Sequence, residues 1–211
     1  MLTKRNFTLG HKTKILNMKS LLSLVFLMTA LSLSAQDKDL PYYEMASYPE
    51  QFTAGGVSSR LIDGLGFRFY WATEGLREND LAFKPGKDAR TSLETITHIY
   101  EMSFIILNST TKTANVSGQD IPLPYADMRK RTLENFKNAS DRLRTATDQE
   151  MKEFKLSFKQ GDQSVEFPFW HQLNGPIADC IWHTGQLVSF RRSSGNPFNE
   201  TVNVFSGKAG K

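Results

Sequence analysis

Apolar residues recur every three or four positions through four long segments of this chain, which is the spacing of an amphipathic α-helix. The segments cover residues 55–77, 91–107, 125–146 and 167–192. Polar stretches rich in turn residues separate them, with Lys84-Pro85-Gly86 and residues 108–124 as the clearest breaks. The pattern therefore predicts four helices joined by loops.

Each segment carries one apolar stripe that is expected to face a common core. The predicted core residues are Val57, Leu61, Leu65, Phe69 or Tyr70 and Leu76 in the first helix; Leu93, Ile96, Tyr100, Phe104 and Leu107 in the second; Met128, Leu133, Phe136, Ala139 and Leu143 in the third; and Trp170, Leu173, Ile177 and Ile181 in the last.

Local signals refine the helix ends. Thr91 and Glu94 have the spacing of a capping box, so the second helix should begin there. In the last helix the apolar spacing continues through Gly175-Pro176, which predicts a kink instead of a break. Gly195 suits the end of that helix.

Shorter elements are expected between and after the helices. Residues 148–158 suggest an additional helical turn. Residues 154–158 and 165–167 alternate in polarity around Gln160-Gly161-Asp162, which predicts a short β-hairpin before the last helix. The predicted fold class is all-α, and the predicted domain is a four-helix bundle over residues 51–211. An arm at residues 36–50 precedes the bundle, and a strand-like tail ends it.

Residues 1–35 have the organisation of a secretory signal peptide. Basic residues precede an apolar run from Leu21 to Leu33, and cleavage is predicted after Ala35. The apolar run is shorter than the roughly 20 residues of a membrane-spanning helix. Translation could start at Met1 or Met18. The protein is expected to be periplasmic or secreted, with no membrane attachment after cleavage.

The charge balance changes once this segment is set aside. Five of the 26 basic residues and none of the 22 acidic ones lie in residues 1–35, which leaves 21 against 22 and a net charge of −1. A nucleic-acid partner is therefore not expected. The expected partner is a small molecule of unknown identity, and a homodimer is the candidate assembly.

The last helix carries the candidate chemistry. Around the helix axis, His183 lies about 40° and Gln186 about 20° from Asp179. A carboxylate and an imidazole four residues apart can share a small cation. The single cysteine, Cys180, lies about 100° from Asp179 and is predicted to be buried and inert. His171 is about 18 Å along the helix from His183, too far to share an ion.

Several residues together resemble the DinB-like metalloprotein superfamily. They are Leu81-Ala82-Phe83-Lys84-Pro85 after the first helix, His98 on the second, and His183-Thr184-Gly185-Gln186-Leu187 on the last. The ending from Arg191 to Pro197 is similar to exported members from Bacteroidetes-type bacteria. The resemblance extends from about Gln51 onward and implies an up-down-down-up bundle with long crossover loops.

The resemblance also implies a divalent metal held by three side chains in the bundle interior. His98 and His183 match two of the family's three histidines, and Asp179 stands in place of the third. Zinc or nickel is the expected metal, and iron suits a set of two histidines and one carboxylate as well. Gln186 would orient a ligand or a bound water.

Two functions remain open. A metal-dependent transferase or hydrolase would use open coordination positions, with Glu101, three residues after His98, as a weak candidate for a general base or fourth ligand. The alternative is a non-catalytic metal-binding, ligand-binding or interaction module. In that case the His–Asp cluster could also be structural, without a metal.

Overall fold

The computed structural model describes residues 40–116 and 123–210, and helices make up most of this part of the chain. The long helices are α2 (Ala54–Thr73), α4 (Ser92–Thr111), α5 (Tyr125–Thr145) and α8 (Ala178–Ser193). Their bounds agree with the four predicted segments to within a few residues at most ends. The predicted all-α character is confirmed, with a few short strands added.

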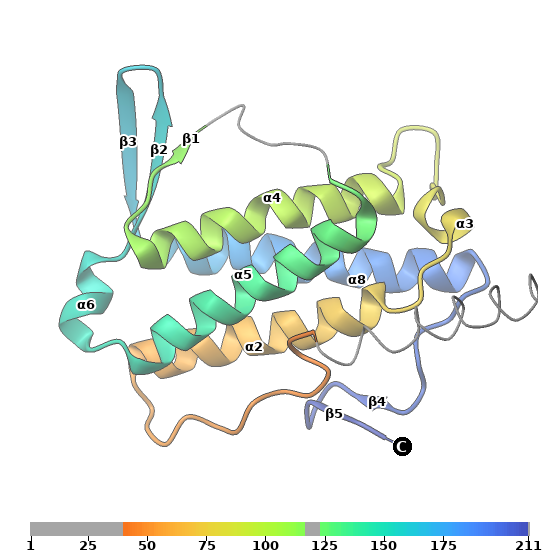
Figure 1. The fold of residues 1–211 in the computed structure, drawn as a ribbon, viewed down its shortest axis with the longest axis horizontal. Helices are drawn as coiled ribbons and strands as arrows, with labels where there is room; N and C mark the ends of the chain where they lie inside the picture. Colours follow the sequence, from red (N-terminus) through yellow and green to blue (C-terminus); the bar gives the residue numbers. More distant parts are fainter. Residues whose placement is uncertain (1–39, 117–122, 211) are drawn as a thin grey trace, which may run out of the picture. The chain divides into compact units, whose positions relative to one another are not determined.

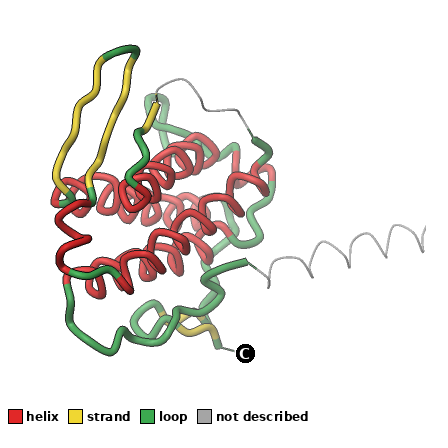
Figure 2. The backbone as a smooth tube through the Cα atoms, turned by 60° about the vertical axis from the view of Figure 1, so that its left-hand side comes forward, coloured by secondary structure: helices red, strands yellow, loops and turns green. Residues whose placement is uncertain are grey.

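Short elements connect the long helices. They are α3 (Glu78–Leu81), β1 (Asn115–Val116), α6 (Asp148–Glu153), β2 (Lys155–Gln160), β3 (Gln163–Pro168), α7 (Trp170–Gln172), the π-helical segment η2 (Leu173–Ile177), β4 (Val202–Asn203) and β5 (Lys208–Ala209). The predicted hairpin is β2–β3, paired antiparallel with Gln160 opposite Gln163, and β1 adds to β2 in parallel. Figure 2 shows this hairpin projecting beyond the helices.

The long helices pack side by side. Both α2 and α4 contact α5 and α8, so each long helix has two long neighbours. Figure 1 shows α2 and α8 running in one direction and α4 and α5 running in the other. This arrangement brings the middle of α4 next to the first turns of α8.

The core between the helices is aromatic and aliphatic. Phe69 of α2 meets Phe136 of α5 edge to face, with ring centroids 6.0 Å apart. At the start of α2 the backbones come close, because a Cβ on Gly55 would lie 2.3 Å from the carbonyl oxygen of Leu143. A glycine is therefore required where α2 meets α5.

The prediction of the core is wrong for some residues, which the structure leaves exposed. Val57 and Leu61 are 57% and 40% exposed, while Ile62 and Leu65 are buried. Apolar residues surround α2 on more than one side, so periodicity alone does not identify the side that α5 and α8 cover. Leu93 and Trp170 are likewise exposed.

The first predicted helix also ends early. Its backbone leaves the helical region at Glu74, and Gly75 has a positive φ of 64°. Leu76 therefore follows the helix instead of extending its stripe.

The arm before α2 is more than a polar linker. Tyr42 is buried against α2, where its hydroxyl donates to Oδ1 of Asp63 at 3.3 Å. The indole of Trp71 donates to the carbonyl oxygen of Tyr43 at 3.1 Å. A Cβ on Gly66 would lie 2.5 Å from the ring of Tyr42, so this glycine makes room for the arm.

The last helical segment is kinked at its glycine–proline pair, as the sequence predicts. It begins at Trp170, because residues 167 and 168 belong to β3. Gly175 has φ −97° and ψ −108°, outside the helical region, and Pro176 follows it within η2. Pro176 has no N–H to donate and disfavours a helical backbone at the residue before it, which accounts for a kink at Gly175.

The predicted signal peptide and its cleavage site lie outside the described residues. Among the residues that the structure does describe, no helix combines the length and apolar character needed to cross a membrane.

Candidate metal centre

The irregular segment η2 leads directly into the first turn of α8, where Asp179 lies. The helix is regular from Ala178 onward, so Asp179 and His183 occupy successive turns of one face. Thr184 and Leu187 are buried, and Cys180 has no exposed surface. These buried neighbours hold α8 in place beneath the two polar side chains.

The third side chain comes from α4. This helix begins at the predicted capping box, in which the Thr91 hydroxyl accepts from the amide of Glu94 and the Glu94 carboxylate accepts from the amide of Thr91. Ile96 and Ile99 anchor the helix in the core and leave His98 at its edge, 22% exposed and facing α8.

The three side chains converge. Nε2 of His98 lies 2.9 Å from Oδ2 of Asp179, and Nε2 of His183 lies 3.5 Å from Oδ1 of the same carboxylate. The two imidazole rings are perpendicular, with centroids 4.9 Å apart. One ligand atom from each residue lies within 4.8 Å of the other two. The structure therefore brings together the three residues proposed from the sequence.

Gln186 fixes the orientation of one histidine. Its Oε1 atom lies 2.7 Å from Nδ1 of His183, and in the tautomer with a hydrogen on Nδ1 this contact is a hydrogen bond that Gln186 accepts. In the neutral ring, Nε2 of His183 is then left with a lone pair that faces the Asp179 carboxylate. Two electron-rich atoms in this arrangement repel each other unless a positive charge lies between them.

The donor set fits a small divalent cation. Zinc bound tetrahedrally at about 2.05 Å keeps its ligand atoms about 3.4 Å apart, and one ligand atom from each of the three residues lies within 4.8 Å of the other two. Two imidazoles and one carboxylate also match the set used for non-haem iron.

The site opens toward solvent on the Asp179 side. The side chain of Asp179 is 40% exposed, while that of His183 is 16% exposed. A cation held here would keep positions available for water or another small ligand. This partial opening distinguishes the cluster from a fully enclosed structural site.

Other candidates lie elsewhere. Glu101 is half-buried one turn after His98, outside the group of mutually close ligand atoms. His171 is exposed, with its ring 5.2 Å from that of Phe167. Burial raises the pKa of the Cys180 thiol far above its usual range, which agrees with the predicted inert role.

The segment from Arg191 to Pro197 holds the end of α8 against the loop after α2. Arg191 donates to the carbonyl oxygen of Trp71 at 2.7 Å, and Asn196 donates to that of Gly75 at 2.9 Å. Ser194 and Asn196 both donate to the buried carboxylate of Asp80, at 2.6 and 2.7 Å. The sequence pattern does not single out Asp80, and its only local signal is its place directly before the Leu81–Pro85 motif.

Comparison of the chain with models of protein families, with curated proteins and with solved structures found no match. The assignment of a function therefore depends on the residues and their geometry.

Proposed function

We propose that this protein binds a divalent metal ion through His98, Asp179 and His183. One observation carries the proposal. Nε2 of His183 lies 3.5 Å from a carboxylate that also meets His98, and in the tautomer with a hydrogen on Nδ1, which Gln186 can accept, its lone pair faces that carboxylate. A cation placed among these three groups removes the repulsion and satisfies all of them.

We further propose that the fold is a DinB-like four-helix bundle of the up-down-down-up type. The directions of α2, α4, α5 and α8 in Figure 1 support this topology. Because α4 and α5 run in the same direction, the connection from Thr111 to Tyr125 joins opposite ends of the bundle, as this topology requires. The connections from α2 to α4 and from α5 to α8 join helices at the same end and contain short elements such as α3 and α6. The position of the candidate ligands on α4 and α8 supports the same family.

The partly exposed carboxylate favours a metal with open positions, as a metal-dependent transferase or hydrolase would need. A bound divalent ion at such a site can polarise a substrate or lower the pKa of a bound water. In this chain, Gln186 holds the proton on Nδ1 of His183, and His98 steadies the carboxylate from the opposite helix. Zinc or nickel suits this donor set best, and iron is also compatible.

The second candidate function is a non-catalytic module with a metal-free His–Asp cluster. The observation that favours it is the 2.9 Å contact between His98 and Asp179, which is also the length of an ordinary hydrogen bond. In this case the His183 ring would lie directly beside the carboxylate, with 3.5 Å between its Nε2 and Oδ1 of Asp179. The two proposals differ in whether a metal stabilises the fold.

We also propose export, with removal of residues 1–35. The support is the sequence pattern of that segment. Mass spectrometry of the protein from an exporting bacterial host should give a mature chain beginning at Gln36, and a retained N-terminus would contradict the proposal.

A thermal unfolding series tests metal binding. A ligand present at a hundred times its dissociation constant stabilises the folded state by about 2.7 kcal/mol, so micromolar zinc should raise the melting temperature of the protein by several degrees. The variant His183→Ala should lose this shift, whereas His171→Ala, which changes an exposed histidine outside the cluster, should keep it. An equal shift in both variants would contradict the proposed ligands.

A further inference from the structure

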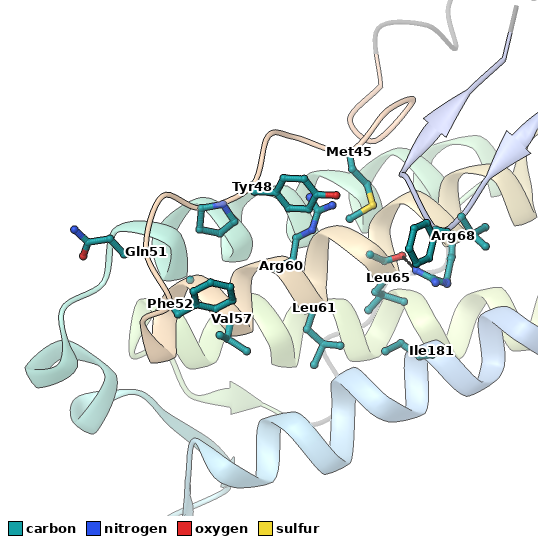
Figure 3. Close-up of a pocket in the computed structure, with 15 residues that line it drawn as sticks. Met45, Tyr48, Gln51, Phe52, Val57, Arg60, Leu61, Leu65, Arg68 and Ile181 are labelled. Atoms are coloured by element: carbon teal, nitrogen blue, oxygen red, sulfur yellow. Dashed lines mark hydrogen bonds between the residues drawn. The ribbon is translucent and has the colours of Figure 1, made fainter.

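A second feature is an open apolar groove on the outer side of α2. Its volume is about 810 Å³, within the range of about 300–1,000 Å³ typical of small-molecule sites. Figure 3 shows the arm before α2 and the chain after α8 forming its walls, with Ile181 of α8 beside Leu61 and Leu65 at the floor.

The floor of the groove is the apolar stripe that periodicity assigned to the core. Val57, Leu61, Gly64 and Leu65 follow one another along a single face of α2 and all line the groove. Val57 and Leu61 remain exposed because neither α5 nor α8 covers them fully. Exposing this apolar helix face to water is unfavourable in free energy, and an apolar ligand that covered the face would remove that penalty.

Exposed aromatic rings extend the apolar surface. Phe52 of the arm is fully exposed, Tyr48 is 73% exposed and Phe205 near the C-terminus is 94% exposed. All three line the groove. They come from segments more than 150 residues apart in the sequence, so the fold itself gathers them around one space.

Two arginines provide the polar part of the lining. Arg60 stacks on the ring of Tyr48, with 4.4 Å from its guanidinium carbon to the ring centroid, and donates to the carbonyl oxygen of Ala46. Arg68 donates to the carbonyl oxygen of Gly64 at 3.0 Å, within its own helix. Within residues 40–116 and 123–210, neither guanidinium has a carboxylate partner.

We propose that this groove binds a single amphiphile that has a long acyl chain and an anionic head group. The chain lies along the apolar face of α2, and the head group pairs with Arg68, whose guanidinium has only one backbone contact. From Val57 to Arg68 the helix rises about 16 Å, which suits an extended chain of about twelve carbons. The charge complementarity selects an anion over a neutral lipid.

This site is separate from the metal centre. Ile181 lines the groove, while Asp179, two residues earlier, points about 160° away around α8 toward His98. Binding of the amphiphile therefore does not depend on the metal ligands, and it can be measured in the presence of a chelator.

Isothermal titration calorimetry with sodium dodecanoate, below its micelle concentration and with EDTA present, tests the proposal. We expect one saturable site for dodecanoate and none for butyrate at the same concentrations. The neutral methyl ester of dodecanoate should bind at least tenfold more weakly than the acid.

Variants locate the site. Arg68→Gln should weaken dodecanoate binding about tenfold, and Phe205→Ser should also weaken it, because an exposed ring that covers the chain is lost. Arg131→Gln, at an exposed arginine on α5, is the matched control and should bind like the wild type. All three positions are exposed or half-buried, and circular dichroism checks that the helices are retained.

Several results would overturn the proposal. The first is the absence of saturable dodecanoate binding. The second is unchanged affinity in Arg68→Gln. The third is binding only to vesicles of phosphatidylglycerol, which would assign the groove to a membrane surface. The fourth is a concentration-dependent dimer that Phe205→Ser abolishes and dodecanoate does not affect, which would assign the groove to a second copy of the chain.

Discussion

His98 and Asp179 are 81 residues apart in the sequence, yet Nε2 of the histidine lies 2.9 Å from Oδ2 of the carboxylate. The contact joins α4 to α8 and places both residues next to His183. Because of this contact, His98, Asp179 and His183 form one cluster.

Gln186 should tune the affinity of this site without supplying a ligand. Replacing it with leucine removes the acceptor that holds the proton on Nδ1 of His183, so the ring loses its fixed tautomer. We expect zinc affinity to fall about 10- to 100-fold in Gln186→Leu. Competition with a chromophoric chelator measures this change.

The exposed Gln163 of β3 provides the control for that measurement. Gln163→Leu makes the same chemical change far from α8 and should leave zinc affinity as in the wild type. Equal affinities for Gln186→Leu and the wild type would show that Gln186 has no part in holding the metal.

Asp80 should contribute to stability in a pH-dependent way. The Arg77 side chain, together with Ser194, the Arg77 amide and Asn196, holds the pKa of this buried carboxyl well below its usual range, against the opposing effect of burial. Because the folded pKa lies below the unfolded value of about 3.9, this stabilisation is present at neutral pH and is lost as the pH falls below about 5.

Urea unfolding between pH 7 and pH 3 measures the effect. Asp80→Asn should unfold more easily at pH 7, by about 2 kcal/mol, and its stability should decline less steeply toward acid than that of the wild type. Asp162→Asn, in the exposed turn between β2 and β3, should follow the wild type. Parallel curves for Asp80→Asn and the wild type would contradict a depressed pKa at Asp80.

Gly66 should be required for the docking of the arm. An alanine Cβ there would meet the Tyr42 ring at 2.5 Å, so Gly66→Ala is expected to destabilise the protein by about 1–3 kcal/mol. Gly185 on α8 has nothing within 4 Å of a built Cβ, and Gly185→Ala should instead stabilise by up to about 1 kcal/mol. Chemical denaturation compares the two, and a stabilising Gly66→Ala would contradict the packing of Tyr42.

Local signals in the sequence predicted much of the secondary structure. The capping box at Thr91 and Glu94, the hairpin around Gly161 and the irregular helix at Pro176 each depend on residues close in sequence, and the structure has all three. That Asp179 and His183 lie on one face of α8 also follows from their spacing of four residues on a helix.

What the sequence could not supply depends on tertiary packing. Periodicity placed Val57 and Leu61 in the core, but which apolar side of α2 is covered depends on where α5 and α8 pack. The sequence predicts an arm before α2, but nothing local indicates that its Tyr42 enters a space left by Gly66. The role of Asp80 likewise depends on Ser194 and Asn196, more than 110 residues away.

The metal content of the purified protein tests the central claim most directly. Elemental analysis of the untagged wild type should give close to one equivalent of a divalent transition metal, and His98→Ala and Asp179→Ala should each lose most of it. His171→Ala should retain the wild-type content, since its exposed ring lies outside the cluster. A wild-type protein without stoichiometric metal, including after incubation with zinc or nickel, or full metal in both ligand variants, would contradict the account.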